Sequence, residues 1–223
     1  MENSHQKQLL MAGGFVVLVI GITVFLALFS AGKTVGGFAS SKTSPIVASD
    51  HIRGNASSSV TIIEYGDFEC PACGAYEQIM QQLTKKYGDR VGFIFRQFPL
   101  YQIHPNARIS AQASEAAALQ GKFWEMHDVL YSKQTEWSDI ATTDIVKKNF
   151  DLYARSIGID VDQFNTDIIS SSTIAHVENQ RKEGDNSQVN HTPTFFLNLN
   201  QIQNPTSVEA FSELINAALA DHK

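Results

Sequence analysis

The sequence has few cysteines, with only two among 223 residues. So few cysteines exclude the small secreted domains that several disulfides hold together. Clusters of lysine and arginine are also missing and the net charge is −6, so we expect no nucleic acid partner. The length suits one domain of ordinary size with additional segments.

Residue spacings typical of a metal site are missing as well. A structural zinc site needs four ligands, but there is no third cysteine and the seven histidines include no pair at zinc-finger spacing. The acidic residues Asp160, Asp162 and Asp167 lack the glycine and glutamate of an EF-hand loop. We therefore expect no metal ion.

The two cysteines, Cys70 and Cys73, form a Cys-x-x-Cys motif. The apolar residues 60–65 before it predict a strand, and residues 74–87 after it predict a helix. Pro71 suits the first turn of that helix and places Cys70 at its N-cap. Backbone N–H groups and the helix dipole stabilise a thiolate there, so the pKa of Cys70 should lie below about 8.5.

Three other interpretations of the motif were weighed. Half of a zinc site lacks further ligands, and a c-type haem needs a histidine where this chain has Gly74. A purely structural disulfide would close a very short loop and stabilise little. Reversible oxidation fits best: Cys70 exchanges with other thiols, and Cys73, one turn further in, resolves the mixed disulfide. The redox-active disulfide Cys70–Cys73 would then carry the electrons, and no cofactor is expected.

The N-terminal part contains a long uncharged stretch. Residues 1–8 are a short polar tail, and residues 9–31 carry no charge. About 20 apolar residues cross a bilayer, whereas a signal peptide has an apolar stretch of about 7–15. We therefore predict a transmembrane anchor at residues 9–31, with cleavage after residue 31 as the alternative. Residues 32–49 predict a flexible linker, and residues 50–223 the folded domain.

The remaining segments alternate between strand and helix patterns. Residues 90–98 and 194–199 predict strands, and the first of these should pair in parallel with residues 60–65. Residues 201–203 predict a partner edge strand for residues 194–199. Residues from about 106 to 183 show the hydrophobic spacing of helices, and residues 208–220 predict a final helix.

Four residues of the helical region and its start invite a functional interpretation. Trp124 and His127 stand at helical spacing and are interpreted as packing residues. His104 is interpreted as a loop residue, and His176 as a solvent-exposed residue on a polar helix.

The chain resembles the thioredoxin superfamily over residues 60–76, with Cys70-Pro71-Ala72-Cys73 as its motif. More narrowly it resembles the DsbA-like thiol:disulfide oxidoreductases of bacterial cell envelopes, including the membrane-tethered BdbD type. Three further stretches carry this resemblance: Gly54-Asn55-Ala56, Phe95-Arg96-Gln97-Phe98-Pro99-Leu100 with His104-Pro105-Asn106-Ala107, and Thr192-Pro193-Thr194-Phe195-Phe196. The resemblance covers residues of about 50–220. It implies an α/β thioredoxin-like fold with a helical insertion, preceded by the transmembrane helix.

The resemblance also implies residue roles. Glu64, six residues before the first cysteine, would be a buried carboxylate beneath Cys73 that relays its proton, with a pKa raised by burial. The alternative from the sequence alone is that Glu64 faces solvent or a partner lysine, and the resemblance favours the buried role. Thr192 and a cis Pro193 would bind extended substrate segments.

Three further residues near the cysteines bear on the redox potential of the site or on the acidity of Cys70. Pro71 and Ala72, between the cysteines, would set the redox potential. His191 stands where family members often have glycine. It is either a rim residue or a cation that favours the thiolate.

The expected function is an extracytoplasmic thiol:disulfide oxidoreductase that introduces disulfides into folding secreted proteins with free thiols. Its reoxidant would be a DsbB- or VKOR-like membrane protein. The chain would be a monomer with a single span in the cytoplasmic membrane and its catalytic domain on the oxidising side. A reductase or isomerase with the same site remains an alternative, although isomerases of this superfamily generally dimerise through an extra domain. The other alternative is a tethered peptide-binding module without turnover.

Overall fold

The computed structural model describes residues 41–141 and 143–221. The predicted polar tail, the predicted transmembrane anchor and the first part of the predicted linker, residues 1–40, lie outside the described residues. Within the part that the structure describes, no helix is both long and apolar enough to cross a membrane.

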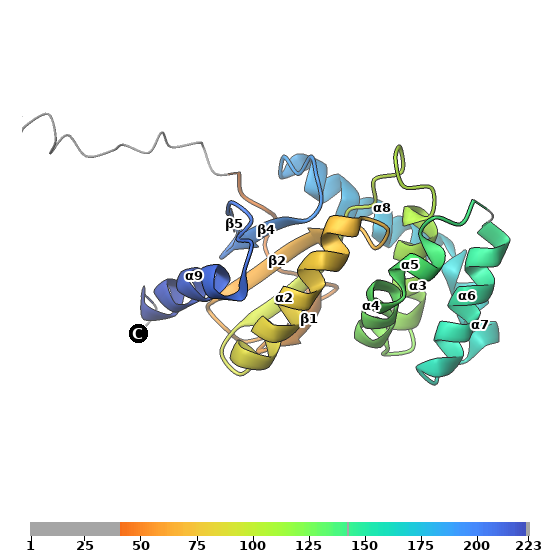
Figure 1. The fold of residues 1–223 in the computed structure, drawn as a ribbon, viewed down its shortest axis with the longest axis horizontal. Helices are drawn as coiled ribbons and strands as arrows, with labels where there is room; N and C mark the ends of the chain where they lie inside the picture. The colour runs from red at the N-terminus through yellow and green to blue at the C-terminus, as the bar shows by residue number, and fades with distance from the viewer. Residues whose placement is uncertain (1–40, 142, 222–223) are drawn as a thin grey trace, which may run out of the picture. The chain divides into compact units, whose positions relative to one another are not determined.

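A mixed five-stranded sheet forms the centre of the folded domain (Figure 1). The two central strands run parallel, and the other neighbours pair antiparallel. All residues of the central strands are buried, which is typical of strands covered on both faces. In spatial order the strands are β1 (His51–Gly54), β3 (Gly92–Gln97), β2 (Thr61–Gly66), β4 (Thr194–Leu197) and β5 (Asn200–Gln201).

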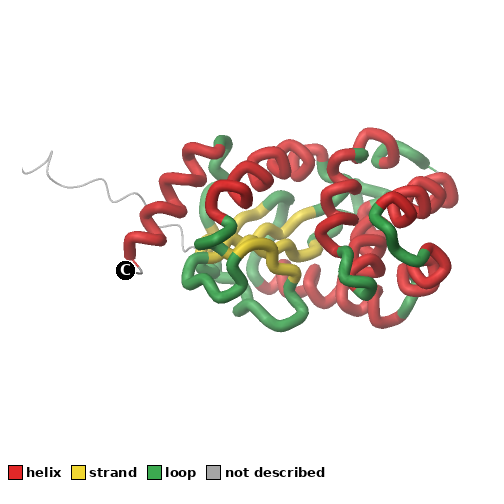
Figure 2. Tube along the Cα trace, turned by 90° about the horizontal axis from the view of Figure 1, so that it is seen from below, coloured by secondary structure: helices red, strands yellow, loops and turns green. Residues whose placement is uncertain are grey.

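Helices cover both faces of this sheet, as Figure 2 shows. The helix after the cysteine motif, α2 (Pro71–Tyr87), packs with the C-terminal helix α9 (Val208–Asp221) over one face, around Ile62, Phe93 and Phe195. Between β3 and β4 the chain forms α3 (Ala107–Ala118), α4 (Phe123–Ser132), α5 (Gln134–Trp137), α6 (Thr143–Ser156), α7 (Val161–Ile168) and α8 (Ser171–Asn186). These helices enclose a second core around Trp137, Phe150 and Phe164.

The predicted elements agree with this architecture except at a few places. The parallel pairing of β2 with β3 is confirmed, and the helices of the insertion span residues 107–186 instead of about 106–183. Two elements were not predicted, β1 and the short α5. Both are four residues long, too short for a hydrophobic period to be visible.

Residues 41–49, the second half of the predicted linker, belong to the folded domain. The fully buried guanidinium of Arg96 pairs with Asp50 at 2.8 Å. It also donates to the backbone carbonyl groups of Ser44 and Pro45, each at 3.0 Å. A buried arginine needs such partners. The backbone N–H of Gln201 also donates to the Ser41 carbonyl at 2.9 Å, so the folded domain reaches back at least to residue 41. The predicted boundary at residue 50 is corrected accordingly.

Candidate active site

The two cysteines lie at the junction between β2 and α2. Cys70 is the N-cap residue and Pro71 begins the helix, as the position of the proline predicts. The preceding turn is held by Asp67, whose buried carboxylate accepts hydrogen bonds from the backbone N–H of Glu69 at 2.8 Å and of Leu100 at 2.9 Å. These contacts fix the direction in which the chain enters the helix.

The two thiols are free and have opposite acidities. A hydrogen bond from the Cys73 thiol lowers the pKa of Cys70 to about 5, and backbone N–H groups of Ala72 and Cys73 act in the same direction against the effect of burial. Burial raises the pKa of Cys73, and the hydrogen bond to Cys70 and the charge of Glu64 raise it further. Near neutral pH the site therefore holds one thiolate and one thiol.

The segment before β4 lies against the first cysteine. The Cys70 thiol donates to the backbone carbonyl of Thr192 at 3.4 Å, and the Thr192–Pro193 peptide bond is cis. The Thr192 hydroxyl is buried and has no hydrogen-bond partner among the described residues while Cys70 is a thiol, and the Cys70 thiolate can accept a hydrogen bond from it. It is the side-chain group that lowers the pKa of Cys70, after the Cys73 thiol. Asn204 supports this loop by donating to the Pro193 carbonyl at 2.7 Å.

His191 is exposed, and its Nδ1 lies 2.8 Å from Oδ1 of Asn190. This is the arrangement of a rim residue, the first of the two interpretations.

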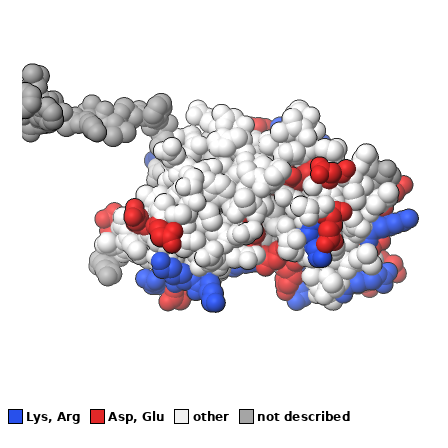
Figure 3. Space-filling view, in the orientation of Figure 1, with Lys and Arg blue, Asp and Glu red and all other residues white. Residues whose placement is uncertain are grey.

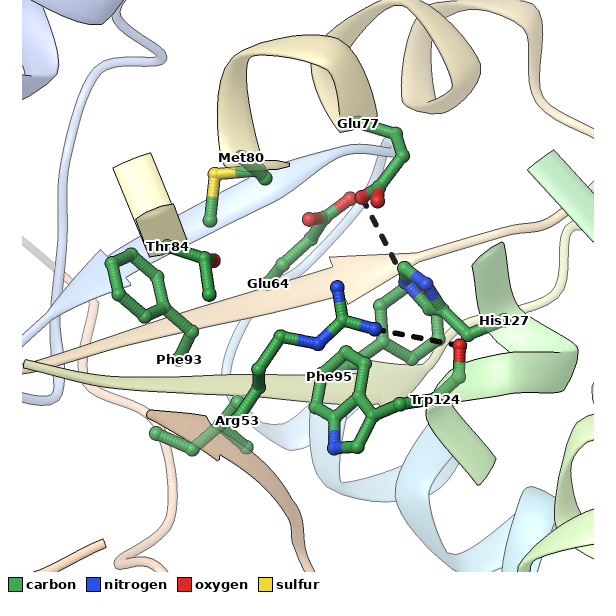
Figure 4. Close-up of a pocket in the computed structure, with 10 residues that line it drawn as sticks. Arg53, Glu64, Glu77, Met80, Thr84, Phe93, Phe95, Trp124 and His127 are labelled. Carbon is green, nitrogen blue, oxygen red and sulfur yellow. Dashed lines mark hydrogen bonds and ion pairs between the residues drawn. The ribbon is translucent and has the colours of Figure 1, made fainter. Parts of the chain in front are cut away.

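Glu64 is buried in β2 on the side that faces α2. Burial raises the pKa of its carboxyl group, and the nearby charges of Glu77 and Cys70 raise it further. The solvent-exposed alternative for Glu64 is therefore wrong. Its side chain lines a cavity of ≈ 20 Å³ together with Glu77 and His127 (Figure 4). A cavity of this volume has room for about one water molecule.

Glu77 and His127 are residues of this site that the sequence reasoning missed. Oε2 of Glu77 lies 4.0 Å from Nε2 of His127, and the other carboxylate oxygen is buried without a hydrogen-bond partner in the described chain. Burial raises the pKa of Glu77, partly offset by His127. Figure 4 shows the carboxylates of Glu64 and Glu77 next to each other, with His127 and Arg53 on the other side of the cavity.

His127 continues this set of charged groups toward the surface. Its Nδ1 lies 2.9 Å from Asp128, whose side chain is 41% exposed and pairs with Arg53 at 2.7 Å. The packing interpretation of His127 is also met, since its ring contacts Phe68 and Phe95 edge-on. The sequence does contain one indication of this group of residues. Glu77 is a charged residue one turn after Cys73, on the face of the predicted helix that should be buried.

His104 is also closer to the site than its loop assignment implied. Its Nδ1 lies 2.7 Å from Oδ2 of Asp67, and this hydrogen bond raises the pKa of His104, helped by the charge of Cys70. Beside it a groove of ≈ 510 Å³ extends from Pro71 to the insertion. The groove has a mixed lining, with apolar side chains such as Ile103 and Ile140 and polar ones such as Gln134 and Asp139.

This arrangement is suited to thiol–disulfide exchange. An ionised sulfur at a helix N-terminus both attacks disulfides and leaves easily, and a shielded second thiol can resolve the mixed disulfide. A buried carboxyl group with a raised pKa can accept the proton of that second thiol.

Curated proteins of known sequence match most of this chain. The chain is 37% identical over 171 residues to a protein named Na(+)/H(+) antiporter NhaA 3 from Salinispora tropica, covering 77% of this chain and 25% of that protein. It is 37% identical over 172 residues to the Na(+)/H(+) antiporter NhaA 1 of Mycolicibacterium gilvum, covering 75% of this chain and 26% of the other. The chain thus spans about a quarter of the length of these curated relatives.

Solved structures with the same architecture carry names from disulfide chemistry. Oxidised BdbD from Bacillus subtilis superposes with a TM-score of 0.70 at 22% identity, covering 81% of this chain and 98% of BdbD. Wolbachia pipientis alpha-DsbA1 gives 0.68 at 18%, covering 80% and 96%. A protein-disulfide isomerase from Novosphingobium aromaticivorans gives 0.64 at 16%, covering 76% and 97%. The predicted α/β thioredoxin-like fold is confirmed. A family model described as thioredoxin matches residues 47–217, so the chain belongs to the thioredoxin family.

Proposed function

We propose that this chain is a thiol:disulfide oxidoreductase that introduces disulfides into folding proteins. The observation that carries the proposal is the opposite acidity of its two thiols, with the pKa of Cys70 lowered to about 5 and that of Cys73 raised. A stabilised Cys70 thiolate stabilises the reduced enzyme, which makes its disulfide the stronger oxidant.

The reaction begins with the Cys70–Cys73 disulfide of the oxidised enzyme. A substrate thiolate attacks Cys70, the bond between the two enzyme sulfurs breaks, and Cys73 leaves with the electron pair and takes up a proton. A second substrate thiolate then attacks the substrate sulfur of the mixed disulfide, and Cys70 leaves as a thiolate. The substrate has lost two electrons and gained a disulfide, and the enzyme is the reduced dithiol.

Glu64 is the group that exchanges the Cys73 proton in this scheme. It is buried and lies close enough to Cys73 for its charge to raise the pKa of that thiol. With its own pKa also raised, it can hold and release a proton near neutral pH. During reoxidation Glu64 would accept the proton that Cys73 must lose.

The substrate would lie across Thr192, Pro193 and the groove beside Pro71. The Thr192 backbone lies next to the Cys70 sulfur, where an extended segment can add main-chain hydrogen bonds. In Figure 3 few charged side chains stand on the upper middle of the molecule, over β4 and the beginning of α2. An uncharged, partly apolar surface suits segments of unfolded chains of varied sequence.

The setting of the reaction is part of the proposal. The uncharged residues 9–31 would anchor a monomer in the cytoplasmic membrane. The catalytic domain would lie on the extracytoplasmic side, because disulfides persist in oxidising compartments. Secreted proteins with free thiols would be its substrates, and a DsbB- or VKOR-like membrane protein would reoxidise it.

A reductase or isomerase is the second candidate, because one of the structural neighbours is named a protein-disulfide isomerase. The reduction potential against glutathione separates the candidates. A value near −120 mV is typical of a DsbA-type oxidant and one near −270 mV of a thioredoxin-type reductant.

The decisive assay mixes the oxidised chain with a reduced, unfolded protein that has two cysteines. We expect stoichiometric oxidation of the substrate by the natural chain. Cys70→Ser and Cys73→Ser should each abolish it, because neither variant can form the enzyme disulfide that oxidises the substrate. Substrate binding with no loss of substrate thiols would instead favour a tethered binding module and overturn the proposal.

A further inference from the structure

We propose that His51, Glu115 and His176 form a binding site for a divalent transition-metal ion, with zinc as the ion that fits best. The site lies away from the cysteines, where β1, α3 and α8 meet. Their sequence spacing conceals it, because the three residues come from three separate segments.

The ligand atoms are already gathered around one point. Nε2 of His51 lies 2.8 Å from Oε2 of Glu115, and Nε2 of His176 lies 3.4 Å from the same oxygen. All three atoms lie within 4.8 Å of one another. In a tetrahedral zinc site with bonds of about 2.0–2.2 Å, neighbouring ligand atoms are about 3.4 Å apart. The distance from His176 to Glu115 already matches, and the distance from His51 to Glu115 has to open by roughly half an ångström. The two histidine nitrogens lie within 4.8 Å of each other.

One ligand atom of the cluster lacks a hydrogen-bond partner among the described residues. Nε2 of His176 is buried and makes no hydrogen bond to any described residue, although a carboxylate oxygen lies nearby. A buried imidazole nitrogen without a partner costs free energy. A cation bound between the three groups would satisfy that nitrogen together with the buried carboxylate of Glu115.

Neighbouring residues hold two of the ligands in place. The other carboxylate oxygen of Glu115 accepts a hydrogen bond from Nε2 of Gln97 at 2.8 Å, which leaves Oε2 directed at the histidines. The His51 ring stacks on Phe123 with 3.6 Å between ring centroids. Such outer contacts orient the ligands of metal sites.

The site has an open side. A cavity of ≈ 370 Å³ is lined by the three ligands and by the side chains of Ser172, Thr173 and Leu119. Two neutral histidines and one carboxylate leave a divalent ion with one net positive charge. Three protein ligands with an open fourth position are typical of a zinc ion that also binds water or a small ligand.

A second group of possible ligands, Glu77, His127 and Asp128, is less suitable. The Arg53 guanidinium lies 2.7 Å from Asp128, so a metal ion there would meet a positive charge at close range. Near the His51 site, Arg96 is already paired with Asp50, so the positive charge of that arginine is neutralised.

A metal ion at this position would connect the edge strand β1 to two helices of the insertion. Because the site exists only in the folded chain, the ion would stabilise the fold in proportion to its occupancy. We assign it this stabilising role, independent of the proposed oxidoreductase function.

The test is a zinc titration of the full chain without a polyhistidine tag, with Cys70 and Cys73 oxidised so that their thiolates do not bind zinc. Calorimetry should give one equivalent of bound zinc, and the melting temperature should rise with zinc concentration. His176→Ala, a change at a partly exposed helix position, should weaken binding at least about tenfold. His191→Ala removes an exposed histidine outside the cluster and should bind zinc as the natural chain does.

Two further variants keep the proposal falsifiable. Glu115→Gln keeps the shape of the side chain and should also weaken binding, with folding checked by circular dichroism. His127→Gln, in the other group, should not weaken it. Absence of zinc binding, zinc binding unaffected by His176→Ala, or loss of binding in His127→Gln would each overturn the proposal. Activity toward thiols is not measured, so failure here leaves the proposed function untouched.

Discussion

Reduction of the Cys70–Cys73 disulfide should change the stability of this protein in a strongly pH-dependent manner. The pKa of Cys70 is lowered to about 5 in the folded, reduced chain, whereas an unperturbed thiol has a value near 8.5. A lowered pKa contributes stability that is present at high pH and is lost as the pH falls toward the folded value. The free energy of unfolding of the reduced form should therefore rise with pH between about 5 and 8.5, beyond any rise in the oxidised form.

The size of this effect follows from the two pKa values. Between pH 5 and pH 7 the ionisation of one thiol with these values adds up to about 2.3 kcal/mol. Because solvent partly screens a thiolate at the mouth of a helix, this is an upper bound. For a chain of this length it corresponds to a shift in melting temperature of roughly 5–9 °C. At pH 7 the whole ionisation term, about 2.7 kcal/mol, corresponds to a reduction potential up to about 60 mV above that of a site with ordinary thiols.

The assay is thermal unfolding of the oxidised and reduced forms in parallel between pH 5 and pH 8. The oxidised form is the matched control, since it contains the same titrating groups except the two thiols. The thiolate absorbance of the reduced form gives the pKa of Cys70 directly, and Cys70→Ser should remove both signals. Parallel pH profiles for the two redox forms, or an absorbance midpoint near 8.5, would refute the reasoning.

Three substitutions test other parts of the structure. Glu64→Gln removes a proton acceptor without changing shape, so reoxidation of the reduced dithiol, in which Cys73 must lose its proton, should be about tenfold slower or worse in stopped-flow assays. Unchanged reoxidation kinetics would make Glu64 a structural residue. Thr192→Val removes the buried hydroxyl beside the thiolate and should raise the pKa of Cys70 by up to about one unit, which a thiolate titration would contradict if the midpoint did not move. Arg96→Met leaves Asp50 buried without its cation and should cost about 3–5 kcal/mol in urea unfolding. The control is Arg90→Met, which removes an exposed pair with Asp89 and should change stability by less than about 0.5 kcal/mol. If Arg96→Met and Arg90→Met destabilised the protein equally, that result would count against residues 41–50 as part of the fold.

The parts of the site that the sequence predicted are those that local chemistry determines. Pro71 fixes where α2 begins, and the position of Cys70 at its N-cap follows within one residue. The order of strand, helix and strand determines that β2 and β3 run parallel. These inferences need only neighbours in the sequence or the handedness of a common unit. The position of Thr192 next to the sulfur, by contrast, came from resemblance to a family.

The parts that the sequence did not predict depend on contacts between distant segments. Arg96 stands in an alternating strand pattern and shows no sign that its side chain is buried. Its partner Asp50 and the carbonyl groups of residues 44 and 45 lie in a stretch of linker-like composition. In the same way, His127 approaches Glu77 only because the insertion folds back over α2. Composition and period give no access to such pairs, because each partner is ordinary in its own segment.

The grouping of Glu64, Glu77 and His127 bears on how a proton could leave this buried site. Burial raises the pKa of both carboxyl groups, and the charge of Glu77 raises that of Glu64 further. The pair therefore favours a protonated carboxyl group, whose proton can be exchanged with Cys73. Glu77 faces His127 at 4.0 Å, and His127 in turn contacts the partly exposed Asp128. The protonatable groups thus continue from the sulfurs to the surface. Their macroscopic pKa values belong to the coupled group as a whole, so the pH dependence of reoxidation, in which Cys73 loses its proton, reports on this chain of residues and not on Glu64 alone.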